Sequence, residues 1–209
     1  MKVLIIGATG GTGRQLLKQA LAQRHEVTVL VRKPSRIKIK HACLRAIKGD
    51  VFDQRSVEAA TQGQQVVISA MGVWPTRKPT TLLWEGTANI IRAMNNQGVH
   101  RLICITGIGA GDSRGHGGFF YNKIVLPYLL KNIYEDKDRQ EELIRNTDLD
   151  WIIARPARLT KGPLTGNYLI LTDLTHITAK KISRADVADF CLKQLTNNFY
   201  LGQTPLLTY

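Results

Sequence analysis

A glycine-rich turn near the amino terminus constrains the fold of this chain more than any other feature. Lys2–Ile6 is an apolar run of β-strand type, and the next seven residues, 7–13, read Gly-Ala-Thr-Gly-Gly-Thr-Gly before a helical pattern begins. In such a strand–turn–helix unit, backbone N–H groups and the positive end of the helix dipole are available to a phosphate. The turn therefore predicts a dinucleotide-binding site at the start of a first helix over 12–23.

The spacing of Gly7, Gly10 and Gly13 fits what a pyrophosphate site requires. Gly7 permits the tight turn, Gly10 lets a pyrophosphate approach the main chain, and Gly13 lets the helix pack close to the sheet. The spacing differs from the standard G-x-G-x-x-G, so a purely structural glycine turn is the alternative. The residues of this turn that we expect to bind the cofactor are Gly7, Thr9, Gly10, Gly11, Thr12 and Gly13.

The rest of the chain alternates strand-type and helix-type patterns, which is typical of stacked βαβ units. We expect strands at Lys2–Ile6, Glu26–Val31, 44–47, 65–70, 101–106 and 150–154, with a short edge strand at 204–207. Helices are expected over 12–23, 53–61, 81–96, 119–132, 136–146 and 183–195. The predicted fold is α/β: a single domain over 1–209 with a doubly wound parallel sheet of Rossmann type. Right-handed crossovers favour the strand order 3-2-1-4-5-6, with ligands at the carboxyl ends of strands one and four.

Composition excludes several other classes of protein. The 209 residues suffice for one domain, and a hydrophobic content of 44% excludes intrinsic disorder. No apolar run approaches the length of about 20 residues that a membrane span needs. The start of the chain lacks a signal-type cleavage site. Cys43, Cys104 and Cys191 are scattered, which argues against a disulfide framework or a metal site. We expect a cytoplasmic protein without membrane association or bound metal.

The charge of the chain favours an anionic small ligand. Lys and Arg number 29 against 16 Asp and Glu, which gives a net charge of +13. A basic cluster at 32–40 has no aromatic residues among it, so a base-stacking surface for nucleic acid is poorly supported. The expected partner is therefore a small-molecule acceptor, anionic or conjugated, and not nucleic acid. We expect a monomer or a weak homodimer.

The end of the second strand indicates which dinucleotide binds. An NAD-selective site has Asp or Glu there, whereas this chain has Arg32, followed by Arg36. A guanidinium pairs with a 2′-phosphate that a carboxylate would repel. The predicted cofactor is therefore NADP(H), with Arg14 available to neutralise phosphate. The alternative for the arginines is a solvated charge run on a surface loop.

Residues after the later strands are expected to surround the rest of the cofactor. Asp50 and Val51 are candidates for the adenine, although a plain turn with a core valine is an equal alternative. Small residues at the switch point allow close approach of the cofactor ribose. The remaining expected cofactor contacts are Ala70, Met71, Gly72, Thr106, Gly107, Pro156 and Ala157.

The sequence lacks the Tyr-x-x-x-Lys pair that short-chain carbonyl reductases use for proton transfer. Hydride transfer to a conjugated acceptor needs no dedicated acid residue, because stacking of the two ring systems and partial exclusion of water suffice. The candidate catalytic residues are Thr106, Tyr121, Lys137 and Arg158; for each, an ordinary structural role is the alternative. A substrate-side segment at about 107–136 is either a mobile lid over the substrate or a helix that packs on the sheet edge or serves self-association.

The chain resembles the atypical short-chain dehydrogenase/reductases, in the branch of the biliverdin reductase B-like flavin reductases and the NmrA-like proteins. The resemblance is carried by the turn at 7–13, 27–32 with Arg36, Gly49-Asp50-Val51, Pro163-Leu164-Thr165-Gly166 and Ile182-Ser183 with Asp186. It implies an NADPH-dependent oxidoreductase that passes hydride to a flavin, quinone or other conjugated acceptor. The alternative within the same branch is a non-catalytic NADP(H)-binding redox sensor. Flavin reductases of this branch carry a serine where this chain has Gly107 and a histidine where it has Arg158.

Overall fold

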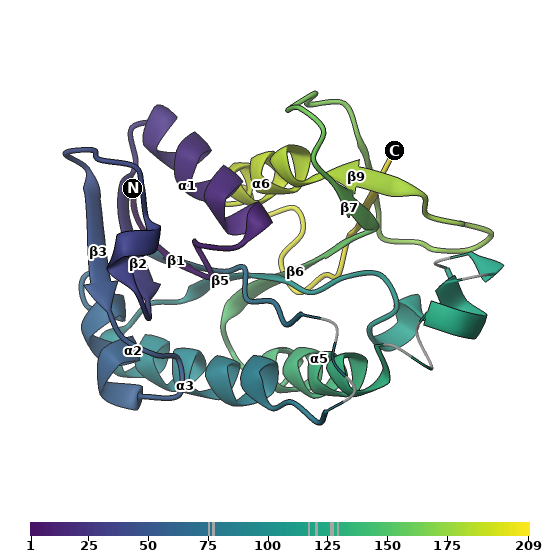
Figure 1. Ribbon diagram of the computed structural model, residues 1–209, viewed down its shortest axis with the longest axis horizontal. Helices are drawn as coiled ribbons and strands as arrows, with labels where there is room; N and C mark the ends of the chain where they lie inside the picture. The colour runs from purple at the N-terminus through teal and green to yellow at the C-terminus, as the bar shows by residue number, and fades with distance from the viewer. Residues whose placement is uncertain (75, 77, 117, 120, 126–127, 129) are drawn as a thin grey trace.

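The computed structural model describes all residues except 75, 77, 117, 120, 126–127 and 129, and describes only the backbone of Tyr121 and Asn122. It has three layers, with a central sheet between two layers of helices (Figure 1). Helices α1 (Gly11–Ala22) and α6 (Arg184–Lys193) cover one face of the sheet. Helices α2 (Gln54–Thr61), α3 (Leu82–Gln97) and α5 (Lys131–Arg145) cover the other.

Among the described residues, eight strands form the sheet in the order β3-β2-β1-β4-β5-β6-β10-β8. The predicted order of the first six strands is confirmed. All of their pairings are parallel. Their bounds are β1 Lys2–Ile6, β2 Glu26–Val31, β3 Leu44–Lys48, β4 Val66–Ser69, β5 Arg101–Ile105 and β6 Asp150–Pro156.

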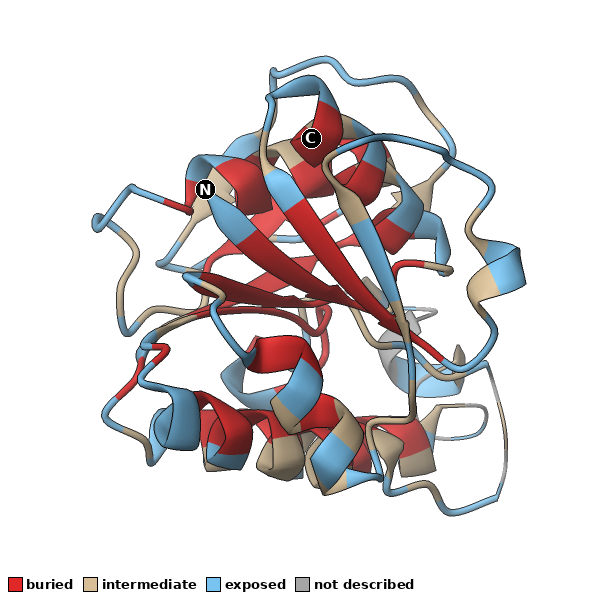
Figure 2. Cartoon of the chain, turned by 90° about the vertical axis from the view of Figure 1, so that its left-hand side faces the viewer, coloured by how far each residue is buried: buried red, intermediate tan, exposed pale blue. Residues whose placement is uncertain are grey.

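The apolar strands are buried because helices cover both faces of the sheet. One core cluster fills the space under α1 and α6, and a second lies between the sheet and α2, α3 and α5. Figure 2 shows buried residues along the central strands and on the inner sides of the helices. Strands covered on both faces read as continuous apolar runs, which explains the sequence of Lys2–Ile6. The described residues also include three short helical elements: η1 (Pro34–Arg36), η2 (Gly111–Ser113) and η3 (Tyr121–Val125).

The prediction of an edge strand at 204–207 was wrong. The strand β10 (Leu206–Thr208) runs parallel to β6 and antiparallel to β8 (Leu169–Leu171), so it lies inside the sheet. All three of its residues are buried. The short strand β8 takes the edge position instead, and its three apolar residues were too brief a signal to predict.

The predicted start of the helix at 136–146 was wrong. Helix α5 runs from Lys131 through Arg145, and Asp136 lies buried within it. Of the helix predicted at 119–132, the structure describes the helical segment Tyr121–Val125, and residues 120, 126–127 and 129 lie outside the described residues. The Asp136 carboxylate accepts hydrogen bonds from the backbone N–H groups of Leu83 and Trp84 at 3.1 and 2.9 Å. This aspartate therefore caps the start of α3 and does not start a helix of its own, because tertiary packing supplies the N–H groups that it needs.

The predicted cap of the last helix is confirmed. The Ser183 hydroxyl accepts a hydrogen bond from the Asp186 N–H at 2.9 Å. The buried Asp186 carboxylate in turn accepts the N–H groups of Thr165 and Gly166 at 2.8 and 2.9 Å. The Pro-Leu-Thr-Gly stretch thus folds around this carboxylate, next to a small second sheet of β7 (Arg158–Thr160) and β9 (Lys181–Ser183).

In the part of the chain that the structure describes, no helix is long and apolar enough to cross a membrane.

Candidate cofactor site and active site

The glycine turn closes against the carboxyl end of β4. Gly7 has a φ of +86°, and a Cβ atom on it would lie 2.3 Å from the Ala70 carbonyl oxygen. A Cβ on Gly13 would lie 2.1 Å from the Gly7 carbonyl oxygen. Side chains are therefore excluded at both positions. The structure brings the turn and Ala70 together at the switch point between β1 and β4, as the sequence predicted.

The start of α1 leaves backbone donors available to a ligand. Gly10 is the N-cap and makes no side-chain cap, and the first helical hydrogen bond runs from the Arg14 N–H to the Gly10 carbonyl at 2.9 Å. The N–H groups of Gly11, Thr12 and Gly13 precede that bond, so the helix itself gives them no acceptor. A turn without side chains below these donors fits a pyrophosphate.

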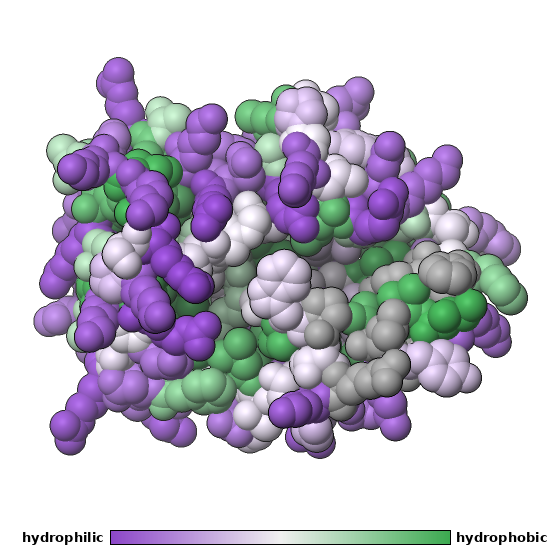
Figure 3. Space-filling model, viewed as in Figure 1, coloured by the Kyte–Doolittle hydropathy of each residue, from purple (hydrophilic) through white to green (hydrophobic). Residues whose placement is uncertain are grey.

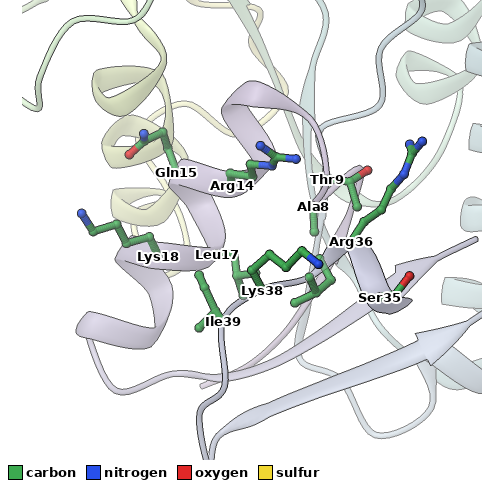
Figure 4. Close-up of a pocket in the computed structure, with 11 residues that line it drawn as sticks. Ala8, Thr9, Arg14, Gln15, Leu17, Lys18, Ser35, Arg36, Lys38 and Ile39 are labelled. Carbon is green, nitrogen blue, oxygen red and sulfur yellow. The ribbon is translucent and has the colours of Figure 1, made fainter. Parts of the chain in front are cut away.

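A basic pocket of about 700 Å³ lies beside this turn, between α1 and the segment after β2. Its walls combine apolar Ala8, Leu17, Ile37 and Ile39 with four cationic side chains, Arg14, Lys18, Arg36 and Lys38. In Figure 4, Thr9 lies between Arg14 and Arg36, while Lys18 points away from them. The arrangement suits an anionic group of a ligand that continues from the turn.

The two predicted arginines are placed differently by the structure. Arg36 lines the pocket, whereas the exposed Arg32 is absent from its lining residues. Lys18 and Lys38 also line the pocket, although the sequence analysis did not assign them to the site. Lys18 follows Arg14 by one helical turn, so that spacing could have pointed to it.

The residues predicted for the adenine meet residues from α3. A Cβ atom on Gly86 would lie 3.0 Å from Val51 Cγ2 and 3.3 Å from the Met71 sulfur. The structure therefore brings Val51 and Met71 together around a bare helix backbone. Asp50 Oδ1 accepts the Phe52 N–H at 3.1 Å, which uses part of its carboxylate within its own turn. A Cβ on Gly72 would meet open space.

A lysine lies at the carboxyl end of β5. Lys137 Nζ donates to the Thr106 carbonyl oxygen at 3.0 Å and lies 4.5 Å from the centroid of the Tyr134 ring. A Cβ on Gly107 would lie only 3.1 Å from Lys137 Nζ, so glycine makes room for the ammonium group. Burial lowers the pKa of Lys137 to about 8, although Glu141 acts in the opposite direction.

A buried ion pair supports the same region. Arg155, on β6, donates from Nε and Nη2 to the two carboxylate oxygens of Glu141, at 3.1 and 2.5 Å. Glu141 Oε1 also accepts the Thr106 hydroxyl at 2.6 Å. The hydroxyl hydrogen of Thr106 is therefore used in the bond to Glu141, and the hydroxyl oxygen can serve a ligand only as a hydrogen-bond acceptor. Arg155 also pairs with Asp112 in the glycine-rich segment.

The other predicted residues are spread more widely. The Pro156 carbonyl accepts the Ile108 N–H at 3.0 Å, and buried Ala157 packs in a small apolar cluster with Ile108. Arg158 is exposed on β7, in the second sheet. The side chain of Tyr121 lies outside the described residues, so its predicted role stays a prediction. On the face that Figure 1 also presents, Figure 3 shows mostly hydrophilic side chains over the β1–β3 side. On the other side it shows hydrophobic side chains at mid-height, with hydrophilic ones above and below them.

Comparison with known proteins decides the family. A model for a family described as NAD(P)H-binding matches residues 7–198, which is most of the chain. The chain belongs to this NAD(P)H-binding family. The glycine turn, the free amides of α1 and the basic pocket all lie within the matched range.

Curated relatives of this NAD(P)H-binding protein have distant sequences. The photosystem II assembly factor Ycf39 of Synechocystis is 28% identical over 81% of this chain, but the chain spans only 48% of its length. An uncharacterized chloroplastic protein of Arabidopsis thaliana is 28% identical over 93% of this chain and 71% of its own. The chain thus spans about half of the first of these relatives.

Solved structures confirm the Rossmann fold of the NAD(P)H-binding protein. The anaerobillin reductase ChuY of Escherichia coli superposes with a TM-score of 0.83 at 24% identity, over 100% of this chain and 97% of that one. A short-chain dehydrogenase/reductase of Veillonella parvula, solved in complex with NADP, gives 0.80 at 17% identity, over 100% and 94%. At such identities the likeness concerns the fold.

The residues that the sequence analysis missed share one property. Tyr134, Glu141, Arg155 and Arg184 lie far along the chain from the glycine motif, on α5, β6 and α6. Arg155 sits in a buried strand, and a single charged residue in an apolar run was its only signal. Within the described ranges, no group of three or more His, Cys, Asp or Glu side chains is placed to hold a metal ion.

Proposed function

We propose that this protein is an NADPH-dependent oxidoreductase that reduces a conjugated small-molecule acceptor, such as a flavin or a quinone. The observation that carries the proposal is Lys137. Its ammonium group lies at the carboxyl end of β5, beside Gly107, where a doubly wound sheet receives the nicotinamide half of a dinucleotide. The NAD(P)H-binding family match supports the cofactor, and the acceptor is our inference.

The choice of NADPH over NADH rests on the basic pocket. Arg14, Arg36 and Lys38 line this pocket together with Thr9, between α1 and the segment after β2. A 2′-phosphate carries two charges near neutral pH, so guanidinium and ammonium groups favour it strongly over a hydroxyl. No described acidic residue lines this pocket to repel it.

The proton of the proposed reaction comes from Lys137. The cofactor, when bound, would supply a hydride, that is, two electrons and one proton, to the acceptor. The Lys137 ammonium donates the matching proton and is reprotonated by water. With a pKa of about 8, Lys137 is mostly protonated at pH 7 and still acidic enough to transfer its proton readily. The Thr106 carbonyl oxygen accepts a hydrogen bond from Lys137, and the bond from the Thr106 hydroxyl to Glu141 fixes the position of Thr106.

The acceptor side is proposed to be apolar with a cationic edge. Trp74 after β4 and Phe119 in the segment after β5 expose 89% and 80% of their surface, which is unusual for large aromatic side chains. Flat rings stack on such groups. Arg158 gives a cation for an anionic acceptor, and the segment at about 107–136 is the proposed cover of this side.

A second candidate is a non-catalytic NADP(H)-binding regulator. Two relatives carry the name of the photosystem II assembly factor Ycf39, and this name mentions no reaction. The Thr106 hydrogen is bound to Glu141, so this hydroxyl offers no proton to a substrate. Under this alternative Lys137 is a structural donor to the strand end.

Turnover with an acceptor panel separates the two candidates. NADPH oxidation with FMN, FAD and quinones, followed by loss of nicotinamide absorbance, should exceed a blank without protein. We expect the wild-type rate to fall above about pH 8; Lys137→Met should lower kcat by about 100-fold or more and remove that fall. Lys131→Met, at an exposed position on the same helix, is the control and should keep both. A flat trace with every acceptor supports the regulator, and an unchanged Lys137→Met profile removes Lys137 from catalysis.

A further inference from the structure

Arg184 lies across the glycine turn, although it is far from that turn in the sequence. A Cβ atom built on Gly11 would lie 2.6 Å from Arg184 Nε and 2.7 Å from its Cδ. Gly11 is the first residue of α1, and Arg184 is the first residue of α6, so the side chain passes from one helix start to the other. The guanidinium thus sits beside the backbone N–H groups predicted to receive a pyrophosphate.

The position of Arg184 is fixed from two sides. Its Nη1 donates to the Thr160 carbonyl oxygen on β7 at 3.0 Å. Gln19 Nε2 on α1 donates to the Ala185 carbonyl at 2.9 Å, which ties the middle of α1 to the first turn of α6. The first hydrogen bond orients the Arg184 side chain, and the second holds the helix start that carries it against α1. Its remaining guanidinium N–H groups are the ones a ligand could use.

The charges around Arg184 favour the binding of an anion. The start of α1 carries the positive end of the helix dipole, which disfavours a nearby cation. In the described part of the chain, no Asp or Glu forms an ion pair with Arg184. An anion between the guanidinium and the amides of α1 would satisfy both groups at once.

We propose that Arg184 is a binding residue for the cofactor pyrophosphate, contributed by α6 and admitted by the missing side chain of Gly11. The inference rests on the NAD(P)H-binding site and not on the proposed acceptor chemistry. It also separates two cationic functions. Arg184 faces the part common to both dinucleotides, whereas Arg36 and the basic pocket face the part found only in NADPH.

Direct binding measurements test this assignment without turnover. Calorimetric titration of Arg184→Gln with NADPH and with NADH should show both Kd values raised by the same factor, about 10- to 100-fold. Arg184→Lys keeps the charge without the planar fork and should lose less. Arg139→Gln removes the same charge from an exposed position on α5 and should leave both Kd values within about twofold. Thermal unfolding without cofactor shows that each variant is folded.

The pairing with Gly11 gives an independent measurement. Gly11→Ala should weaken both dinucleotides by displacing the Arg184 side chain, and its effect should largely disappear in the Arg184→Gln background. This variant also serves if Arg184→Gln does not fold. The proposal is overturned if Arg184→Gln leaves both Kd values unchanged or alters only one of them, or if the two substitutions are simply additive. None of these results depends on whether an acceptor is reduced.

Discussion

The ion pair between Glu141 and Arg155 offers a demanding test of the structure. The Arg155 side chain is 0% exposed and that of Glu141 is 3% exposed, whereas Asp112, the other partner of Arg155, is 70% exposed. Glu141→Gln removes a charge and turns one acceptor oxygen into an amide nitrogen that faces the Arg155 donor. The remaining Gln oxygen can still accept from Thr106.

The magnitude follows from this burial. Removing one partner of a buried ion pair costs about 3–5 kcal/mol, because the other charge is left uncompensated. Since Asp112 still neutralises part of the Arg155 charge, we expect the lower end, about 3 kcal/mol. For a chain of this length, each kcal/mol lowers Tm by about 2–4 °C, which gives a fall of about 6–12 °C.

Thermal unfolding followed by circular dichroism at pH 7 measures this effect. Two other substitutions that each remove one negative charge serve as controls for the change in Tm. Asp112→Asn removes the exposed partner of Arg155 and leaves the buried Glu141 carboxylate in place, so it should cost at most about 1 kcal/mol. Glu142→Gln changes an exposed neighbour on the same helix and should be nearly neutral. The reasoning is refuted if Glu141→Gln lowers Tm no more than Asp112→Asn does.

Two further predictions concern cofactor selectivity and acid stability. In calorimetric titrations, Arg36→Gln should raise the Kd for NADPH about 10- to 100-fold and the Kd for NADH less than about threefold. The same substitution at Arg32, which lies outside the pocket, should raise the Kd for NADPH less. An equal loss of affinity for both dinucleotides in Arg36→Gln would contradict the 2′-phosphate assignment. Burial opposes ionisation of Asp186, but hydrogen bonds from Tyr209, Gly166 and Thr165 outweigh it and hold its pKa below the usual value. The folded-state pKa thus lies below the unfolded one, so this carboxylate stabilises the fold above about pH 4 and loses that contribution as the pH falls through the folded pKa. The urea midpoint of Asp186→Asn should lie below that of the wild type at pH 7, and the gap should narrow in acid; a gap independent of pH would contradict it.

The elements that local sequence signals predicted are those governed by local rules. The strand at Lys2–Ile6, the glycine turn, the cap at Ser183 and the order of six strands follow from periodicity, glycine spacing and right-handed crossovers. Asp136 shows where such rules fail. An aspartate at that place in the sequence is a reasonable helix start, yet it caps α3 from the middle of α5.

The residues of the candidate site likewise fall into those that local sequence signals could predict and those that they could not. Arg36 could be assigned from its position after β2, because one strand end and one loop determine where it lies. The role of Glu141 could not, since its partners Thr106 and Arg155 come from the end of β5 and from β6, whereas Glu141 itself lies on α5. The placement of Arg184 over Gly11 likewise needs α1 and α6 to be packed together.

The sequence by itself determined the doubly wound sheet and the glycine turn to which we assign phosphate binding, because hydrophobic periodicity and glycine spacing act within a few residues of one another. The tertiary structure alone decided which charged side chains surround that turn and the end of β5. Those side chains meet only when helices pack on opposite faces of the sheet. Burial then lowers the pKa of Lys137 and makes the stability of the fold depend on the Arg155–Glu141 ion pair. Burial and long-range contact are properties of the assembled layers, and no short stretch of the chain encodes them.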